Sequence, residues 1–240
     1  MLERIQKILS QQGIASRRKA EELILNKKVF VNNKIAKLGD KADVNIDKIA
    51  INNYQLSVNK NKNNFIYYIL NKPVNFICTV SDKHAKKLVT NLVPKYPKVW
   101  PVGRLDKNST GLIILTNDGE LTNKLTHPSF KHKKEYEVAV DKNITDKFLQ
   151  EMKKGVKLEE GIAKADEIFV GTSHGAFNNK FNIILHQGWK RQIRRMCKEL
   201  NYKVLELKRV RIEKIKLGDL KIGKYRQIKM PLDEYQWQSL

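Results

Sequence analysis

The first sixty residues combine short helical and short extended patterns. Apolar side chains recur at helical spacing over residues 2–11, which predicts a short amphipathic helix that Gly13 ends. Ser16 is a suitable N-cap for a second helix. Runs of β-type residues follow on either side of an Asn32-Asn33 turn and predict short strands. These runs are residues 29–31, Ile35, 44–46 and 49–51.

Residues 57–64 interrupt both patterns. This stretch is polar and has no large apolar side chain except Val58, a composition typical of a linker. We therefore place a domain boundary here, which divides the chain into a domain of residues 1–60 and a domain of residues 61–240.

A longer succession of strand and helix patterns follows the linker. Four consecutive branched aliphatic residues, Leu112 to Leu115, indicate a buried strand. Further strands are predicted over residues 65–70, 76–78, 133–140, 164–170 and 180–186, and β structure is predicted across 204–228. Helices are predicted over residues 84–93, 120–126, 145–154 and 190–200. The mixture predicts the α+β class.

Basic residues outnumber acidic ones by a wide margin. The chain has 47 Lys+Arg against 25 Asp+Glu, a formal net charge of +22. Residues 186–229 contain 15 basic and 4 acidic residues, which is half of the excess. A polyanion is the expected partner of such a chain. A helix that lies on an anionic membrane needs a broad apolar face. Residues 190–200 offer only a narrow one, so we expect nucleic acid and no membrane.

Metal and nucleotide chemistry have little support in the sequence. The two cysteines, Cys78 and Cys197, are far apart, and the five histidines show no ligand spacing. HExxH, Walker and GxGxxG patterns are missing. We expect no metal, no cofactor and two reduced thiols in a cytoplasmic protein. The chain has neither an apolar run of 18 residues nor a secretory signal pattern, so we expect no membrane span.

A polar loop bounded by Gly103 and Gly111 carries a single carboxylate, Asp106, between two cations, Arg104 and Lys107. The loop runs directly into the predicted buried strand, so one of its ends is anchored to the core. That arrangement suits a carboxylate held in a fixed geometry. A solvated Asx-turn is the alternative at this point.

The N-terminal pattern resembles the small RNA-binding domain first described in ribosomal protein S4. The matching features are a helix, a glycine, the run Ala15-Ser16-Arg17-Arg18, a second helix and the turn after Val31. Cations in the first turn of a helix oppose its dipole, which favours an anion docked there. The resemblance implies that phosphates are contacted by Arg17, Arg18, Lys19 and Lys34. A basic helix face exposed only to solvent is the alternative.

The rest of the chain resembles the ribosomal pseudouridine synthases of the RsuA type, which include the large-subunit enzymes RluB, RluE and RluF. The matching motifs are Gly103-Arg104-Leu105-Asp106, Ser109-Thr110-Gly111-Leu112, Thr116-Asn117-Asp118-Gly119-Glu120-Leu121, His127-Pro128, Lys134-x-Tyr136 and Arg191-Gln192-Ile193-Arg194-Arg195-Met196. One departure is the run Gln187-Gly188-Trp189-Lys190, where Glu-Gly-Arg/Met-Asn is more usual. The resemblance implies a catalytic domain built on a mixed, mainly antiparallel β-sheet flanked by helices.

Catalytic roles for three residues follow from this resemblance. Asp106 would be the essential carboxylate, either as a nucleophile or as a base. Arg194 would hold it ionised in a water-poor pocket, because a guanidinium stays charged and can bind a carboxylate through two N–H groups. Tyr136 would stack on the uracil. Arg194 as a phosphate contact and Tyr136 as a core residue are the alternatives.

Arg104 would help to hold the RNA with the target base flipped out of its stack. Lys134, Arg191 and Arg195 are further RNA-binding candidates. The reaction has no redox step, which agrees with the absence of a cofactor.

The expected activity is the isomerisation of uridine in ribosomal RNA by a monomer. The C-terminal helix and the run that follows it look most like the large-subunit (23S) enzymes, particularly RluF. A small-subunit (16S) substrate is an alternative. So are a non-catalytic RNA-binding or ribosome-assembly protein and a DNA-binding protein.

Overall fold

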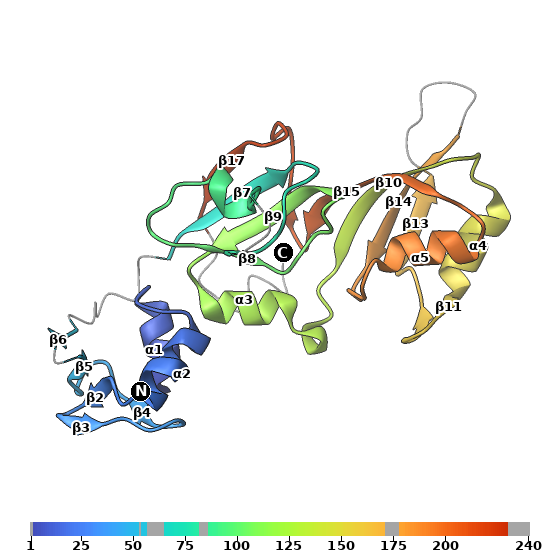
Figure 1. Ribbon diagram of the computed structural model, residues 1–240. Coiled ribbons are helices and arrows are strands. Elements are labelled where there is room, and N and C mark those ends of the chain that lie inside the picture. The colour runs from blue at the N-terminus through green and yellow to red at the C-terminus, as the bar shows by residue number, and fades with distance from the viewer. Residues whose placement is uncertain (1, 53, 57–64, 82–85, 171–177, 230–240) are drawn as a thin grey trace. The chain divides into compact units, whose positions relative to one another are not determined.

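The computed structural model describes residues 2–52, 54–56, 65–81, 86–170 and 178–229 (Figure 1). The chain forms two compact units. One unit is Met1–Phe65 together with Asn117–Gly119, and the other is Ile66–Thr116 with Glu120–Leu240. The predicted linker over residues 57–64 lies outside the described residues.

Two helices and several very short strands build the first unit. Helix α1 spans Ile5–Gln11 and helix α2 spans Arg17–Leu25. Ser16 caps α2 as predicted, because its hydroxyl accepts a hydrogen bond of 3.2 Å from the Lys19 amide. The strands are β1 (Glu3–Arg4) paired with β4 (Lys41–Ala42), and a four-stranded sheet in the order β3-β2-β5-β6, made of Lys34–Ile35, Val29–Val31, Ile49–Ile51 and Tyr54–Gln55.

Two predictions for this unit are wrong. The first helix begins at Ile5 instead of residue 2, because the two residues before it pair with β4 as a strand. Residues 44–46 form a turn, in which the Ile46 amide donates to the Asp43 carbonyl at 3.0 Å. The Asp47 carboxylate accepts the Asp43 amide at 2.6 Å and closes the same turn. A local side-chain hydrogen bond therefore overrides the β-type composition of this run.

A nine-stranded sheet forms the framework of the second unit. Its main path has the order β13-β14-β10-β15-β9-β7-β17, with β16 paired to β15 and β8 paired to β9. All its neighbours are antiparallel except β9 and β15, so the sheet is mixed and mainly antiparallel, as predicted. Its strands are β7 (Tyr67–Lys72), β8 (Trp100–Val102), β9 (Thr110–Thr116), β10 (Lys134–Val140), β13 (Glu167–Val170), β14 (Lys180–Leu185), β15 (Val204–Ile212), β16 (Ile215–Lys216) and β17 (Tyr225–Ile228).

Helices cover two separate parts of this sheet. Helix α3 (Gly119–Thr126) packs Leu121 and Leu125 against β7 and β9. Helices α4 (Asp146–Lys154) and α5 (Gln192–Glu199) share one apolar cluster with β10 and β14 (Figure 1). Two 3-10 turns, η1 (Val89–Leu92) and η2 (Pro128–Phe130), and the hairpin of β11 (Val156–Leu158) and β12 (Gly161–Ala163) complete the unit.

The segment between β7 and β8 departs from its prediction. Residues 76–78 form a single bridge, from Ile77 to Leu88, in place of a strand. The helix expected over residues 84–93 is reduced to η1, and residues 82–85 lie outside the described part of the chain. This segment covers one face of β7 and β9, where Val89, Val93 and Val99 are buried. The apolar residues of this segment therefore pack from loops against the sheet. Their positions in the sequence follow neither the helical nor the strand period, so periodicity does not predict their structure.

Candidate active site

The Asp106 loop is held at both ends by buried groups. Leu105 is buried, and its amide donates a hydrogen bond to the Cys78 thiol at 3.3 Å. On the other side, the Ser109 amide donates to the Asp106 carbonyl at 3.0 Å and closes a turn just before β9. The side chain of Asp106 itself is 35% exposed. The main chain of the loop is therefore anchored, but the carboxylate is partly exposed and does not lie in the water-poor pocket that the resemblance implied.

Lys72, at the end of β7, supports this loop from inside the protein. Its side chain is fully buried, and its ammonium donates to the Ser109 carbonyl at 2.7 Å and the Pro73 carbonyl at 3.0 Å. The Lys107 carbonyl lies 3.4 Å from the same nitrogen. Burial lowers the pKa of Lys72, while the nearby Cys78 and Asp106 raise it. One buried cation thus binds two main-chain carbonyls of the Asp106 loop, those of Lys107 and Ser109, and the carbonyl of the adjacent Pro73.

Two arginines of the α5 segment approach the loop. Arg191 lies just before α5 in a left-handed conformation with φ 52°. Its Nη1 atom is 4.0 Å from Oδ2 of Asp106. Arg194 instead donates to the Asn108 carbonyl at 3.0 Å and to the Val204 carbonyl at 3.1 Å. The ion pair predicted between Asp106 and Arg194 is therefore replaced, in the described residues, by one between Asp106 and Arg191.

Arg194 is nevertheless electrostatically coupled to the carboxylate. Burial lowers the pKa of its guanidinium most, the charge of Arg191 lowers it further, and Asp106 raises it. The residue stays charged, since a guanidinium does not deprotonate in proteins. Its Nε atom is buried and has no hydrogen-bond partner among the described residues. Arg194 thus joins the Asp106 loop to β15 and retains one unused donor.

Tyr136 lies on β10 between the two apolar regions of the second unit. It is partly buried and packs against both the cluster around α4 and α5 and the cluster that contains Leu105. Its neighbours Glu135 and Glu137 pair with Arg211 at 2.7 Å and Lys208 at 3.0 Å. Successive side chains of a strand point to opposite faces of the sheet, so Glu135 and Glu137 point away from the clusters that Tyr136 contacts.

The other cations proposed from the sequence fall into two groups. Arg104 is exposed and makes no ion pair within the described residues. Lys134 is turned inward, where its ammonium donates to the His132 carbonyl at 2.9 Å and burial lowers its pKa. Arg195 forms a two-bonded ion pair with Glu160, at 2.8 and 2.7 Å. Arg104 is therefore available to a phosphate, whereas Lys134 and Arg195 already have protein partners.

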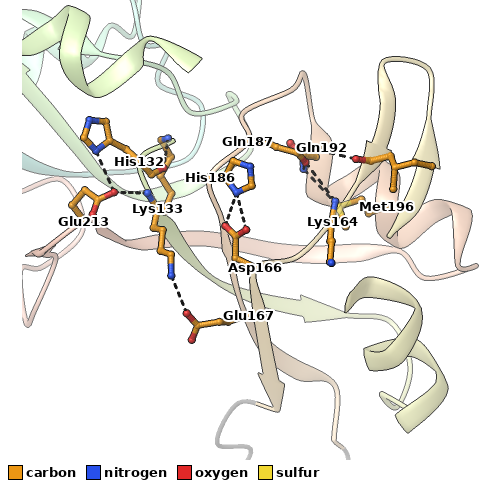
Figure 2. Close-up of polar contacts among 12 residues, drawn as sticks. His132, Lys133, Lys164, Asp166, Glu167, His186, Gln187, Gln192, Met196 and Glu213 are labelled. Atoms are coloured by element: carbon orange, nitrogen blue, oxygen red, sulfur yellow. Dashed lines mark hydrogen bonds and ion pairs between the residues drawn. The ribbon is translucent and has the colours of Figure 1, made fainter. Parts of the chain in front are cut away.

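Gln187, the first residue of the unusual run before α5, makes hydrogen bonds that Figure 2 shows. The Gln192 amide group donates to Gln187 Oε1 at 2.9 Å, and its own oxygen accepts the Trp189 amide at 3.1 Å. Gln187 Oε1 also accepts the Lys164 amide at 3.4 Å. Gln187 therefore helps to fix the main chain that leads to Arg191. Glutamine stands here in place of the usual glutamate, and its side-chain oxygen accepts both of these hydrogen bonds.

Sequence reasoning missed Lys72 and a second buried cation, Arg209. Arg209 on β15 is 3% exposed, and its Nε donates to the Leu112 carbonyl at 2.8 Å. It lies beside Gly111 in the only parallel strand pair of the described sheet. A Cβ on Gly111, which has φ +101°, would lie 2.2 Å from the Arg209 carbonyl oxygen. The lysine in Asn71-Lys72-Pro73 was the available clue, because a charged residue ended a dense apolar strand.

The cations predicted on the first unit are on its surface. Arg17 and Arg18 are exposed in the first turn of α2 and make no ion pair within the described residues. Lys19 pairs with Glu22 at 2.7 Å, a contact open to solvent. Lys34 is exposed and lines a shallow hollow of about 370 Å³ with Lys41. Two uncompensated guanidinium groups thus lie at one helix N-terminus.

Three further findings bear on function. Within the described ranges, no group of three or more His, Cys, Asp or Glu side chains is placed to hold a metal ion. No described helix is both long and apolar enough to cross a membrane. Both cysteines are free and buried, and burial raises the pKa of Cys197 to about 12.

Comparison with known proteins identifies the class. The pattern of the RNA pseudouridylate synthases matches residues 66–199, and the pattern of the S4 domain matches residues 3–45. The chain therefore belongs to the RNA pseudouridine synthase family and is an isomerase of uridine in RNA.

Several relatives match over nearly the whole chain. An uncharacterized RNA pseudouridine synthase of Aquifex aeolicus is 40% identical over 228 residues, which cover 94% of this chain and 90% of that protein. The dual-specificity RNA pseudouridine synthase RluF of Escherichia coli K12 is 38% identical over 225 residues, which cover 94% of this chain and 75% of that protein. Ribosomal large subunit pseudouridine synthase B of Bacillus subtilis is 36% identical over 231 residues, which cover 95% of this chain and 92% of that protein.

A solved structure agrees with the fold. The crystal structure of a pseudouridylate synthase superposes with a TM-score of 0.64 at 23% identity and covers 98% of each chain. The predicted fold, an S4-type domain followed by a synthase domain on a mixed sheet, is confirmed.

Proposed function

We propose that this protein isomerises a specific uridine of large-subunit (23S) ribosomal RNA to pseudouridine. The observation that carries the proposal is the convergence of Arg191 and Arg194 on the loop of Asp106, with Tyr136 packed against the apolar cluster that contains Leu105. The relative named ribosomal large subunit pseudouridine synthase B supports 23S RNA as the substrate. Residues 1–60 would bind the RNA and residues 61–240 would carry out the reaction.

Asp106 is the proposed catalytic carboxylate. The reaction detaches uracil from its ribose, rotates it and reattaches it through carbon-5, so no redox group is required. Asp106 either attacks the substrate or removes a ribose proton. Both roles use the carboxylate oxygens, and the guanidinium of Arg191 lies 4.0 Å from one of them.

The two arginines would act in succession on the carboxylate. In the free protein Arg191 is the nearer cation, at 4.0 Å from Asp106. Bound RNA would exclude water from the partly exposed carboxylate and strengthen its attraction to both guanidinium groups. The unused Nε of Arg194 would then be available to Asp106. Tyr136 would stack on the uracil once the base has left the RNA.

Arg104 would help to hold the RNA while the target base is flipped out of its stack. Moving a nucleotide out of a stack costs a few kcal/mol in a duplex and less in a loop. Arg104 lies two residues before the carboxylate, is exposed, and carries a charge without a protein partner in the described chain. We propose that the protein acts as a monomer in the cytoplasm.

The function is tested by mapping pseudouridines. Ribosomal RNA from cells with and without the gene should differ at one or a few uridines of the 23S molecule, and the purified protein should restore them. A difference confined to 16S RNA would show that the substrate is small-subunit ribosomal RNA instead. Identical maps, with no pseudouridine formed in vitro, would contradict the proposal.

Replacing Arg17 and Arg18 together by alanine should weaken binding to ribosomal RNA. Each lost phosphate contact removes about one released counterion, so the log–log salt slope should flatten by about one to two units. Filter binding over a salt series measures both effects.

The matched control is Lys153→Ala with Lys154→Ala, which removes the same charge from the exposed last turn of α4. An equal change in slope in both variants would show that net charge, and not the α2 surface, governs binding.

Replacing Arg194 by lysine should lower kcat roughly 100-fold, because a loss of about 1 Å in positioning has an effect of this size. A lysine keeps the charge but cannot reach both the Asn108 and the Val204 carbonyls, which the guanidinium joins. Single-turnover pseudouridine formation measures the change.

Arg226→Lys is the control, since Arg226 also donates to a main-chain carbonyl, that of Lys216, but on β17. An unchanged kcat in Arg194→Lys would show that charge alone is sufficient at this position.

A further inference from the structure

The segment between α3 and β10 presents an exposed aromatic ring in an ordered frame. Phe130, at the end of η2, is 50% exposed. The His132 ring lies nearly parallel to it, with centroids 6.0 Å apart and planes inclined by 21°. The His127 ring meets it edge-on at 6.2 Å. A large apolar side chain is thus held open to solvent between two histidines.

Both histidines are fixed by hydrogen bonds, so the frame is not a loose loop. His127 Nδ1 lies 2.7 Å from the Ser129 hydroxyl and accepts the Ser129 amide at 3.3 Å. His132 Nδ1 lies 3.2 Å from a carboxylate oxygen of Glu213, which also accepts the Lys133 amide (Figure 2). Holding the ring before binding reduces the entropy that a ligand must overcome.

The segment also borders the active-site loop. Thr126, the last residue of α3, lies so close to Gly103 that a Cβ there would be 3.5 Å from its methyl group. Gly103 begins the loop of Arg104 and Asp106. At its other end the segment continues directly into β10, which carries Tyr136. Phe130 therefore lies in the connection between Thr126, beside the Asp106 loop, and the strand that carries Tyr136.

The charge around the ring favours an anionic partner. Lys131 follows Phe130 in a left-handed conformation, is exposed, and makes no ion pair within the described residues. The chain as a whole carries a net charge of +22. Aromatic rings beside cations are the usual means of binding single-stranded nucleic acid, because every base has a face that can stack.

We propose that Phe130 is a stacking platform for an unpaired base of the RNA substrate near the target uridine, with Lys131 on the adjoining phosphate. The inference rests on the proposed function for the identity of the substrate. It adds a binding subsite that lies outside the Asp106, Tyr136 and Arg194 set. Phe130 contacts the substrate but no reacting atom, so it contributes to affinity and to the choice of site.

The test compares Phe130→Ala, Phe130→Leu and Phe130→Trp, using ribosomal RNA extracted from cells that lack the gene. Filter binding should show Kd raised roughly tenfold for the alanine and leucine variants and near wild type for tryptophan, as expected for base stacking. KM for pseudouridine formation should rise in parallel while kcat stays unchanged. Melting curves should be similar, since half of the Phe130 side chain is already exposed.

Phe169→Ala is the matched control, because Phe169 is 46% exposed but lies on β13, an end strand of the sheet. Irradiation at 254 nm should also attach a nucleotide to the peptide that contains Phe130. The proposal is overturned if the leucine variant binds as the wild type does, or if Phe169→Ala weakens binding equally.

A different outcome is expected if the proposed function is wrong. In that case the wild type forms no pseudouridine, while the binding series and the cross-link still decide whether Phe130 stacks on RNA.

Discussion

Replacing Asp106 by alanine should abolish pseudouridine formation while RNA affinity falls little. A positioned acid or base contributes roughly 10²–10⁴-fold to a rate, and a nucleophile is indispensable to a covalent route. The affinity should survive, because the side chain is 35% exposed and is not part of the basic surface that binds phosphates. A single-turnover assay and filter binding on the same RNA measure the two properties.

Asp106→Asn tests the same role with almost no change in volume. It removes the negative charge and should be as inactive as the alanine variant. Asp219→Ala, which removes an exposed carboxylate from a turn after β16, is the control and should keep full activity. Activity retained in either Asp106 variant would contradict the mechanism.

Replacing Gly111 by alanine should destabilise the synthase domain by about 3–5 kcal/mol, at the upper end of the effects of point mutations. The added Cβ would lie 2.2 Å from the Arg209 carbonyl oxygen and 2.7 Å from its nitrogen, in a strand pair that cannot separate without breaking the sheet. The positive φ of +101° adds backbone strain. Urea denaturation followed by tryptophan fluorescence measures the loss, since all three tryptophans follow residue 65.

Gly188→Ala is the control for this prediction. A Cβ on Gly188 meets no atom within 4 Å, so its midpoint of denaturation should stay near that of the wild type. A similar midpoint for Gly111→Ala would show that β9 and β15 can move apart at little cost.

Periodicity predicted the elements that have a regular core face. The buried strand at Leu112 and the helix with inward Phe148 and Met152 are both present. Periodicity failed where packing is irregular, as at residues 76–78, and where an aspartate closes a turn, as at residues 44–46. Such contacts depend on residues distant in sequence or on one side-chain hydrogen bond, and neither changes the hydrophobic pattern.

The candidate site was predictable as a set of residues but not as a set of contacts. Motifs identified the segments of Asp106 and Arg194. The spacing of Arg191 and Arg194 does not show which of them lies nearer to Asp106. In the structure the nearer one is Arg191, whose main chain has a left-handed conformation that the motif does not predict. The charged residue at the end of an apolar strand hinted at buried Lys72, but its partners could not be predicted, because two of its three main-chain carbonyls, those of Lys107 and Ser109, belong to a distant loop.

The short parallel contact between β9 and β15 has a consequence for folding. Among the described strands, the main-chain pairing between the half of the sheet next to Asp106 and the half next to α5 consists of two residue pairs, Lys208 with Thr110 and Arg209 with Gly111. Each half can form from its own antiparallel neighbours. We expect this contact to form late in folding, because joining segments that are distant in sequence costs loop-closure entropy. The active site, which lies at this contact, is then expected to be among the last parts of the domain to assemble.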